Sequence, residues 1–137
     1  MREIKFRAWD CALEQIVEWE YLRDTELFDD GFDSNRWALM QFTGLRDMNG
    51  TEIYEGDILK LSYGIPPTSD TVEVVWYSDY YLDMEDEKSI TYCGWWFKNI
   101  RQNGCSAPAG LEYQNDIEII GNIYENPELL KAASTRK

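Results

Sequence analysis

The turn sequence Asn49-Gly50 constrains the fold of this chain more than any other feature. It lies between β-prone stretches inside the segment 41–58, where an Asn-Gly pair is the strongest short-range signal for a β-hairpin. Because both central residues of a type I′ turn need positive φ, which Asn and Gly tolerate, we predict a type I′ turn here. A second turn over 54–57 leads into a short strand over 58–61. The segment therefore favours antiparallel β-structure.

Strands are predicted in three further regions. Residues 4–9 alternate between apolar and polar side chains, which is typical of a half-buried strand. The stretches 72–77 and 90–97 are rich in β-branched and aromatic residues, and we expect them to pair with each other. Residues 13–28 are ambiguous, because their apolar side chains loosely follow a helical spacing while 15–19 could return as a strand. The hairpin is favoured, and the helix remains an alternative.

The rest of the chain contains one predicted loop, one strand and one helix. A proline pair in the middle of 62–71 predicts a surface excursion, because proline cannot donate a hydrogen bond to a sheet ladder. A last strand is predicted over 117–124. Asn126 is a good N-cap and Pro127 suits the first helical position, so a short helix should follow and fray by about Ser134.

Together these elements predict a single mainly-β domain over residues 1–130. Its core would be a small bent antiparallel sheet or a partly open SH3-like barrel, with an N-terminal β extension and a short C-terminal helix. An alternative with a separate N-terminal β subdomain over 1–40 stays open, and 131–137 are predicted to form a frayed tail. A chain of 137 residues can bury a core of this kind without disulfides or metal ions.

The charge of the chain restricts its partners. The formal net charge is −13 and the pI is near 4.3. Proteins that bind nucleic acid or anionic membranes directly gain affinity from Lys and Arg, so we expect neither partner here. Acidic residues concentrate in 24–33 and 79–87, which we interpret as solvated loops. The alternatives are a basic partner, phosphate mimicry or weak binding of divalent cations, and calcium is the weakest of these because its twelve-residue loop pattern is absent. A signal peptide and long apolar runs are absent, which predicts a cytoplasmic protein.

The available side chains argue against catalysis. The chain has no His, which excludes Ser-His-Asp and Cys-His arrangements and any zinc site that contains His. Its three Cys lack CxxC spacing, so we predict reduced thiols, no metal and no cofactor. Two-metal chemistry could use Asp57, Glu73 and Asp79, but such an enzyme should also carry cationic groups for the substrate phosphates. We therefore expect a non-enzymatic protein.

Aromatic residues make up 15% of the chain and include six Trp. In an extended strand Trp95 and Phe97 point to one side and Trp96 to the other, so this strand is either covered on both faces or exposed on one. A two-layer core is one explanation, and an aromatic interface is the other, because Trp and Tyr are enriched at contacts between proteins. The candidate interaction surface combines aromatic and acidic side chains: Trp76, Tyr77, Tyr80, Tyr81, Trp96, Asp83, Glu85 and Asp86.

Three segments of the chain resemble the YopX family of phage and prophage proteins. They are residues 4–10, the block 41–58 and residues 120–130, which together span most of the sequence. The resemblance is weakest over 13–37 and 62–111. It implies a mostly β, cytoplasmic protein encoded by phage-derived DNA in a bacterial host. It implies no established activity and supplies no catalytic or binding residues.

Two hypotheses for function follow from these observations. The first is a non-enzymatic module that acts through contacts with another protein or with copies of itself as a homo-oligomer, which would account for the aromatic surplus. The alternative is an acidic mimic of nucleic acid that occupies the binding site of a host DNA- or RNA-binding protein, which would account for the charge of −13.

Overall fold

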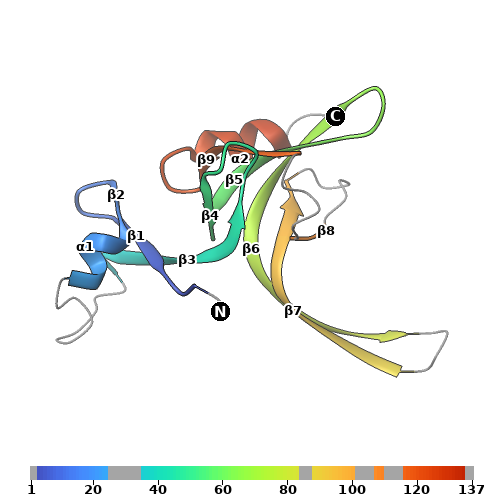
Figure 1. The fold of residues 1–137 in the computed structure, drawn as a ribbon, viewed down its shortest axis with the longest axis horizontal. Helices are drawn as coiled ribbons and strands as arrows, with labels where there is room; N and C mark the ends of the chain where they lie inside the picture. The colour runs from blue at the N-terminus through green and yellow to red at the C-terminus, as the bar shows by residue number, and fades with distance from the viewer. Residues whose placement is uncertain (1–2, 25–34, 84–87, 101–106, 110–115, 135–137) are drawn as a thin grey trace.

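In the residues that the computed structural model describes, the chain forms two antiparallel β-sheets and two short helices (Figure 1). It describes residues 3–24, 35–83, 88–100, 107–109 and 116–134. The predicted mainly-β fold is confirmed, with an N-terminal β extension and a C-terminal helix. No helix within these ranges is long and apolar enough to cross a membrane. The boundaries proposed for the domain and for its subdomain stay predictions.

The first sheet has the strand order β2-β1-β3-β4. Its strands are β1 (Phe6–Asp10), β2 (Gln15–Val17), β3 (Trp37–Arg46) and β4 (Glu52–Tyr54). All neighbouring strands in it are antiparallel, and β1 is paired with β3 along its whole length. Strands β1 and β2 lie at the left of the molecule in Figure 1 and form the N-terminal extension.

The ambiguous stretch 13–28 contains both of the structures considered for it. The return strand β2 is present, and helix α1 (Trp19–Asp24) follows it almost directly. Leu22 of this helix is fully buried, and the helix contacts β1. The favoured hairpin is therefore confirmed, and helix α1 accounts for part of the helical spacing of the apolar residues. Residues 25–28 lie outside the described part of the chain.

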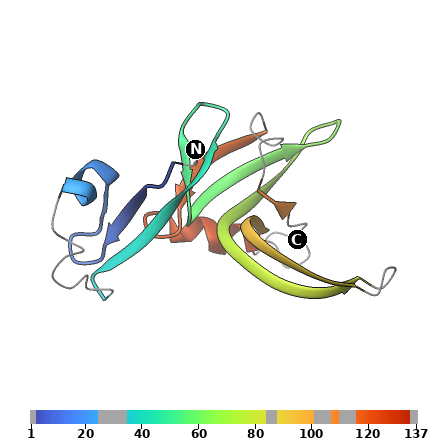
Figure 2. The same cartoon turned by 60° about the horizontal axis from the view of Figure 1, so that its bottom comes forward.

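The second sheet has the strand order β8-β7-β6-β5-β9. Its strands are β5 (Asp57–Tyr63), β6 (Thr68–Asp83), β7 (Lys88–Asn99), β8 (Ala107–Pro108) and β9 (Ile117–Asn122). All of its strand pairs are antiparallel. The sheet is strongly curled and forms a half-barrel (Figure 2). This shape agrees with the predicted bent sheet.

One of two buried hydrophobic clusters among the described residues consists of Met40, Phe42 and Tyr54 of the first sheet. The larger cluster, which we call the core, lies in the second sheet and includes one strand of the first. Its fully or almost fully buried members are Ile53, Leu59, Val72, Val74, Trp95, Phe97 and Ile117. The members on β6 and β7 come from alternate positions that are opposite each other, such as Val74 and Phe97, because successive side chains in a strand face opposite sides. Since Ile53 belongs to β4, this core joins the two sheets.

The Asn49-Gly50 pair closes the β3–β4 hairpin as predicted, but the predicted type I′ geometry is wrong. Gly50 has a φ of +80°, whereas Asn49 does not have a positive φ. A three-residue hairpin loop ending in a left-handed glycine needs only one such residue. The buried Asp47 carboxylate favours this loop, because its Oδ1 accepts hydrogen bonds from the N–H groups of Asn49 and Thr51 at 2.9 and 3.0 Å. Its Oδ2 accepts one from Ile119 of β9 at 3.1 Å.

The surface excursion predicted over 62–71 is wrong in extent. Strands β5 and β6 remain paired down to Tyr63 and Thr68, so only a turn over 64–67 connects them. Both prolines lie inside this turn, where the ladder requires no N–H group from them. The prolines therefore lie between the two strands and do not interrupt their hydrogen-bond ladder.

The C-terminal helix α2 (Pro127–Ser134) begins at the predicted residue and includes the first part of the predicted tail. Asn126 precedes it, but its side chain contacts the preceding strand: Oδ1 accepts a hydrogen bond from the N–H of Asn122 at 3.2 Å. A Cβ atom at Gly121 would lie 2.5 Å from the same oxygen. Glycine at this position thus allows the close approach of β9 to the start of the helix.

Candidate functional site

Strands β6 and β7 extend beyond the rest of the sheet as a two-stranded arm. They are longer than predicted and pair with each other as far as Asp83 and Lys88. Strand β5 accompanies β6 only up to Glu73, and β8 pairs only with Trp96 and Phe97 of β7. We call residues 77–83 and 88–94 the arm. Figures 1 and 2 show that it projects away from both sheets.

Most members of the predicted interaction surface lie on this arm or at its base. Tyr77, Tyr80, Tyr81 and Asp83 are on the β6 side of the arm, and Trp76 immediately precedes it. Glu85 and Asp86 lie outside the described residues. Trp96 is on β7, half-buried and opposite Val75, beyond the base of the arm. The structure thus places five of the eight predicted residues on one continuous segment, and their role stays a prediction.

The aromatic side chains of β6 and β7 divide between the core and the surface. Trp95 and Phe97 are buried in the core, as the two-layer explanation requires. Trp76, opposite Trp95 in register, keeps 47% of its surface exposed. The two indole rings meet edge to face, with centroids 5.0 Å apart and planes at 82°. Trp76 is therefore anchored on the core and exposed at the base of the arm.

Two depressions meet at Trp76, and we call them together the acidic aromatic groove. One has a volume of about 430 Å³ and is lined by Gln41, Glu55, Trp76 and Trp95. The other has a volume of about 200 Å³ and also contains Glu55 and Trp76, together with Glu73 and Tyr124 among others. The groove is built by β3, the β4–β5 turn, β6, β7 and the segment after β9. These elements come from both sheets and from distant parts of the sequence.

The groove is acidic and partly shielded from water. Burial raises the pKa of Glu73, and the positive charge of Lys98, opposite it on β7, partly opposes this shift. Burial also raises the pKa of Tyr124, and the nearby carboxylates of Glu55 and Glu73 add to the effect. Among the described residues that line the groove, none is Lys or Arg. The groove thus holds negative charge next to aromatic rings.

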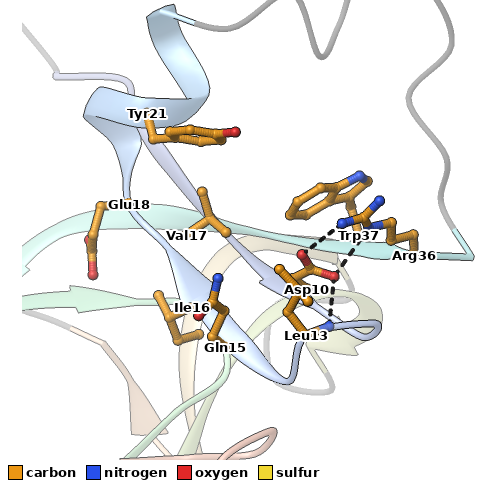
Figure 3. Close-up of a pocket in the computed structure, with 9 residues that line it drawn as sticks. All are labelled: Asp10, Leu13, Gln15, Ile16, Val17, Glu18, Tyr21, Arg36 and Trp37. Atoms are coloured by element: carbon orange, nitrogen blue, oxygen red, sulfur yellow. Dashed lines mark hydrogen bonds and ion pairs between the residues drawn. The ribbon is translucent and has the colours of Figure 1, made fainter.

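A larger pocket of about 610 Å³ lies in the N-terminal extension (Figure 3). At its edge the Arg36 guanidinium donates two hydrogen bonds of 3.2 Å to the carboxylate of Asp10. Asp10 also accepts hydrogen bonds from the N–H groups of Ala12 at 2.9 Å and Leu13 at 3.2 Å. The pKa of Asp10 is therefore lowered, mainly by Arg36. This carboxylate closes the β1–β2 turn, which gives it a structural role.

Two of the carboxylates of the two-metal alternative, Asp57 and Glu73, have described side chains, and that of Asp79 lies outside the described part. Asp57 is 1% exposed, is paired with Arg7, and accepts a hydrogen bond from the Tyr54 N–H at 2.8 Å. Glu73 lines the groove instead. Within the described residues, no group of three or more His, Cys, Asp or Glu is placed to hold a metal ion. Cys11, the cysteine whose side chain is described, is a free exposed thiol.

The groove itself was not predicted as a site. Trp76 was selected from its aromatic neighbours, but Glu55, Glu73 and Tyr124 were not selected as interaction residues. Their convergence depends on the packing of one sheet against the other, which has no local sequence signal. An acidic residue inside an otherwise β-branched run, as Glu73 is within 72–75, is the only hint in the sequence.

These features define a class of small β-proteins with a curled sheet, an N-terminal sheet and a projecting arm. The chain belongs to the YopX protein family, whose model matches residues 5–131. Among solved structures it is similar to the crystal structure of protein EF1440 from Enterococcus faecalis. The identity is 25% and the TM-score 0.55, over 95% of this chain and 99% of the other. No curated protein matches the chain. The resemblance noted in the sequence is thus confirmed.

Proposed function

We propose that this protein is a non-enzymatic, phage-derived interaction module of the bacterial cytoplasm, and that the arm makes the contact. The observation that supports the proposal is a two-stranded ribbon of seven register pairs, from Tyr77↔Gly94 to Asp83↔Lys88. Within the described part of the chain, no third strand pairs with either edge of it. An isolated two-stranded hairpin is at best marginally stable in water. The arm would gain stability from a partner that covers it.

The composition of the arm suits a contact between proteins. Its sequence contains Tyr77, Tyr80, Tyr81 and Tyr92, and Trp76 is exposed at its base. Tyr supplies a large contact area with few rotatable bonds, and it is enriched at interfaces. Open strand edges also offer N–H and C=O groups that can pair with a strand of another molecule. A second copy of the chain or another protein could therefore add to the ribbon.

Light scattering and co-purification from a bacterial lysate test this proposal. In one variant, residues 79–92 are replaced by Asn-Gly, which joins Ser78 to its register partner Cys93 and removes the outer arm. We expect the full chain to form an oligomer or to retain a partner, and the shortened variant to lose this contact. Ile65→Ser, which alters a fully exposed apolar residue on the β5–β6 turn, is the control and should change nothing.

A full chain that is monomeric and retains no protein would contradict the proposal. So would an oligomer or a partner that is unaffected when the arm is shortened. Washing at low and high salt distinguishes the proposed contact from the acidic-mimic alternative, because charge contacts between exposed groups weaken as salt is added. A nucleic-acid-binding partner that is lost at high salt would favour the mimic, whose support is the net charge of −13.

A further inference from the structure

One combination of side chains occurs at the junction of the two sheets. The guanidinium of Arg7 lies 4.7 Å from the centroid of the Tyr54 ring and forms an ion pair with the buried carboxylate of Asp57. A planar guanidinium can stack on an aromatic face while its edge donates hydrogen bonds to a carboxylate. Arginine is thus bound here by a ring and a carboxylate together.

The same combination occurs a second time in the N-terminal extension. The guanidinium of Arg36 lies 4.9 Å from the ring centroid of Trp37 and is hydrogen-bonded to the carboxylate of Asp10. Both arginines belong to the chain itself. Arg46 lies 5.9 Å from the centroid of Phe42 and 3.7 Å from the carboxylate of Glu52, and Lys5 shares this ring and this carboxylate. The fold therefore satisfies several pairs of ring and carboxylate with its own cations.

The acidic aromatic groove has the ring and the carboxylates but lacks the cation. Trp76 is exposed there and lines both depressions together with Glu55. Glu73 and Tyr124 line the smaller depression, and Glu73 faces the opposite side of β6 from Val74 and Trp76. Tyr124 is held in place by Trp9, whose ring is stacked on it at 5.8 Å and 15°. Among the described residues, no Lys or Arg lies over the ring of Trp76.

The charge around the groove favours a cationic ligand. Glu73 is partly withdrawn from water, which raises its pKa, so a positive charge placed beside it would relieve an unfavourable burial. Lys98, opposite Glu73 on β7, is exposed, and its positive charge only partly opposes this shift. The net charge of −13 would attract a basic partner over longer distances.

We propose that the acidic aromatic groove receives an arginine side chain from a basic segment of a partner protein. The guanidinium would stack on Trp76 and pair with Glu55, which repeats the internal arrangements, while Glu73 adds negative charge from the smaller depression. This inference rests on the proposed function, because it names the chemistry recognised at the base of the arm. Arginine is favoured over lysine, because a compact and strongly hydrated ammonium stacks less well on an indole ring.

Titration of the full chain with an acetylated and amidated triarginine peptide, followed by calorimetry and tryptophan fluorescence, tests the inference. Trilysine and triglutamine serve as comparison peptides. The variant Glu55→Gln/Glu73→Gln removes the groove carboxylates, and the control Glu118→Gln/Glu128→Gln changes the net charge equally at exposed positions elsewhere. Trp76→Leu removes the ring and keeps both carboxylates. Thermal melting checks that each variant is folded.

We expect triarginine to bind better than trilysine, and triglutamine not to bind. The groove double variant and Trp76→Leu should each weaken triarginine binding about tenfold, and the control about twofold or less. Equal weakening by the groove and control double variants would overturn the inference, because binding would then follow overall charge. So would the absence of triarginine binding. If a partner is nevertheless retained through the arm, only this inference fails and the proposed function stands.

Discussion

Arg7 on β1 and Asp57 at the start of β5 form an ion pair that ties the first sheet to the second. The two residues are 50 positions apart in the sequence, and the Asp57 side chain is 1% exposed. Asp57 also accepts the hydrogen bond of the Tyr54 N–H, which closes the turn between β4 and β5. The pair thus connects the sheet junction to the turn that carries Glu55 into the groove.

Arg7→Met should lower the free energy of unfolding by about 3 kcal/mol, because it leaves a buried carboxylate without its partner. Burial already raises the pKa of Asp57, and losing Arg7 would raise it further. The loss should therefore be larger at neutral pH than at acid pH, where Asp57 takes up a proton. Urea unfolding at neutral and at acid pH measures the change in the free energy of unfolding. Arg7→Met/Asp57→Asn should recover part of the loss, since Asn can still accept the Tyr54 hydrogen bond.

Glu73→Gln should make the protein more stable at neutral pH. Burial raises the folded-state pKa of Glu73 above its ordinary value of 4.5, so its contribution to stability is present below that value and lost as pH rises through the folded pKa. We expect a gain of less than about 1 kcal/mol, because the group is partly solvated. Denaturant unfolding as a function of pH tests this. Destabilisation at neutral pH, or a gain that persists at acid pH, would contradict it.

Asp10→Asn should destabilise the N-terminal extension in a pH-dependent way. Hydrogen bonds from Arg36, and then from the N–H groups of Leu13 and Ala12, lower the pKa of Asp10 below its ordinary value of 3.8. Its contribution to stability is therefore present above 3.8 and lost as pH falls through the folded pKa. Denaturation midpoints of both proteins should differ at neutral pH and converge in acid. A pH-independent difference would show that charge is not the cause.

Gly121→Ala should destabilise the junction of β9 and α2 by about 1–3 kcal/mol, because the new methyl group would overlap the Asn126 side chain. Asn126→Ala in the same chain should relieve the overlap and recover part of the loss. Gly50→Ala is an instructive comparison, because its φ of +80° is unfavourable but no atom lies within 4 Å of the new Cβ. Comparing the melting temperatures of the three variants distinguishes the effect of the steric overlap at Gly121 from that of backbone strain at Gly50.

The secondary structure followed closely from local patterns in the sequence. Alternation over 4–9, the Asn-Gly turn and Pro127 each identified an element that the structure contains. The errors occurred where a distant group changed the local preference. Asn49 avoids positive φ because Asp47 organises the turn and binds Ile119 of β9 as well. The bonds of Asp47 within the turn are local, but its bond to Ile119, 72 positions away, cannot be detected within a short window of sequence.

The candidate site was only partly predictable for the same reason. Aromatic composition directed attention to Trp76 and to the tyrosines of the arm, and the structure places these residues on one ribbon. The partners of Trp76 in the groove, Glu55 and Glu73, come from different elements, one of them from a turn between the sheets. The spacing of these residues in the sequence does not reveal that they line the same groove.

By itself, the sequence determined the mainly-β character, the positions of the turns and the acidic charge of this protein. These properties depend on backbone preferences and composition, which act within a few residues or over the whole chain. The tertiary structure decided which carboxylates meet cations, which aromatic ring remains exposed and where the arm leaves the sheet. Those outcomes depend on the packing of the two sheets against each other, through Ile53 in the core and through Arg7 and Asp57 at the junction.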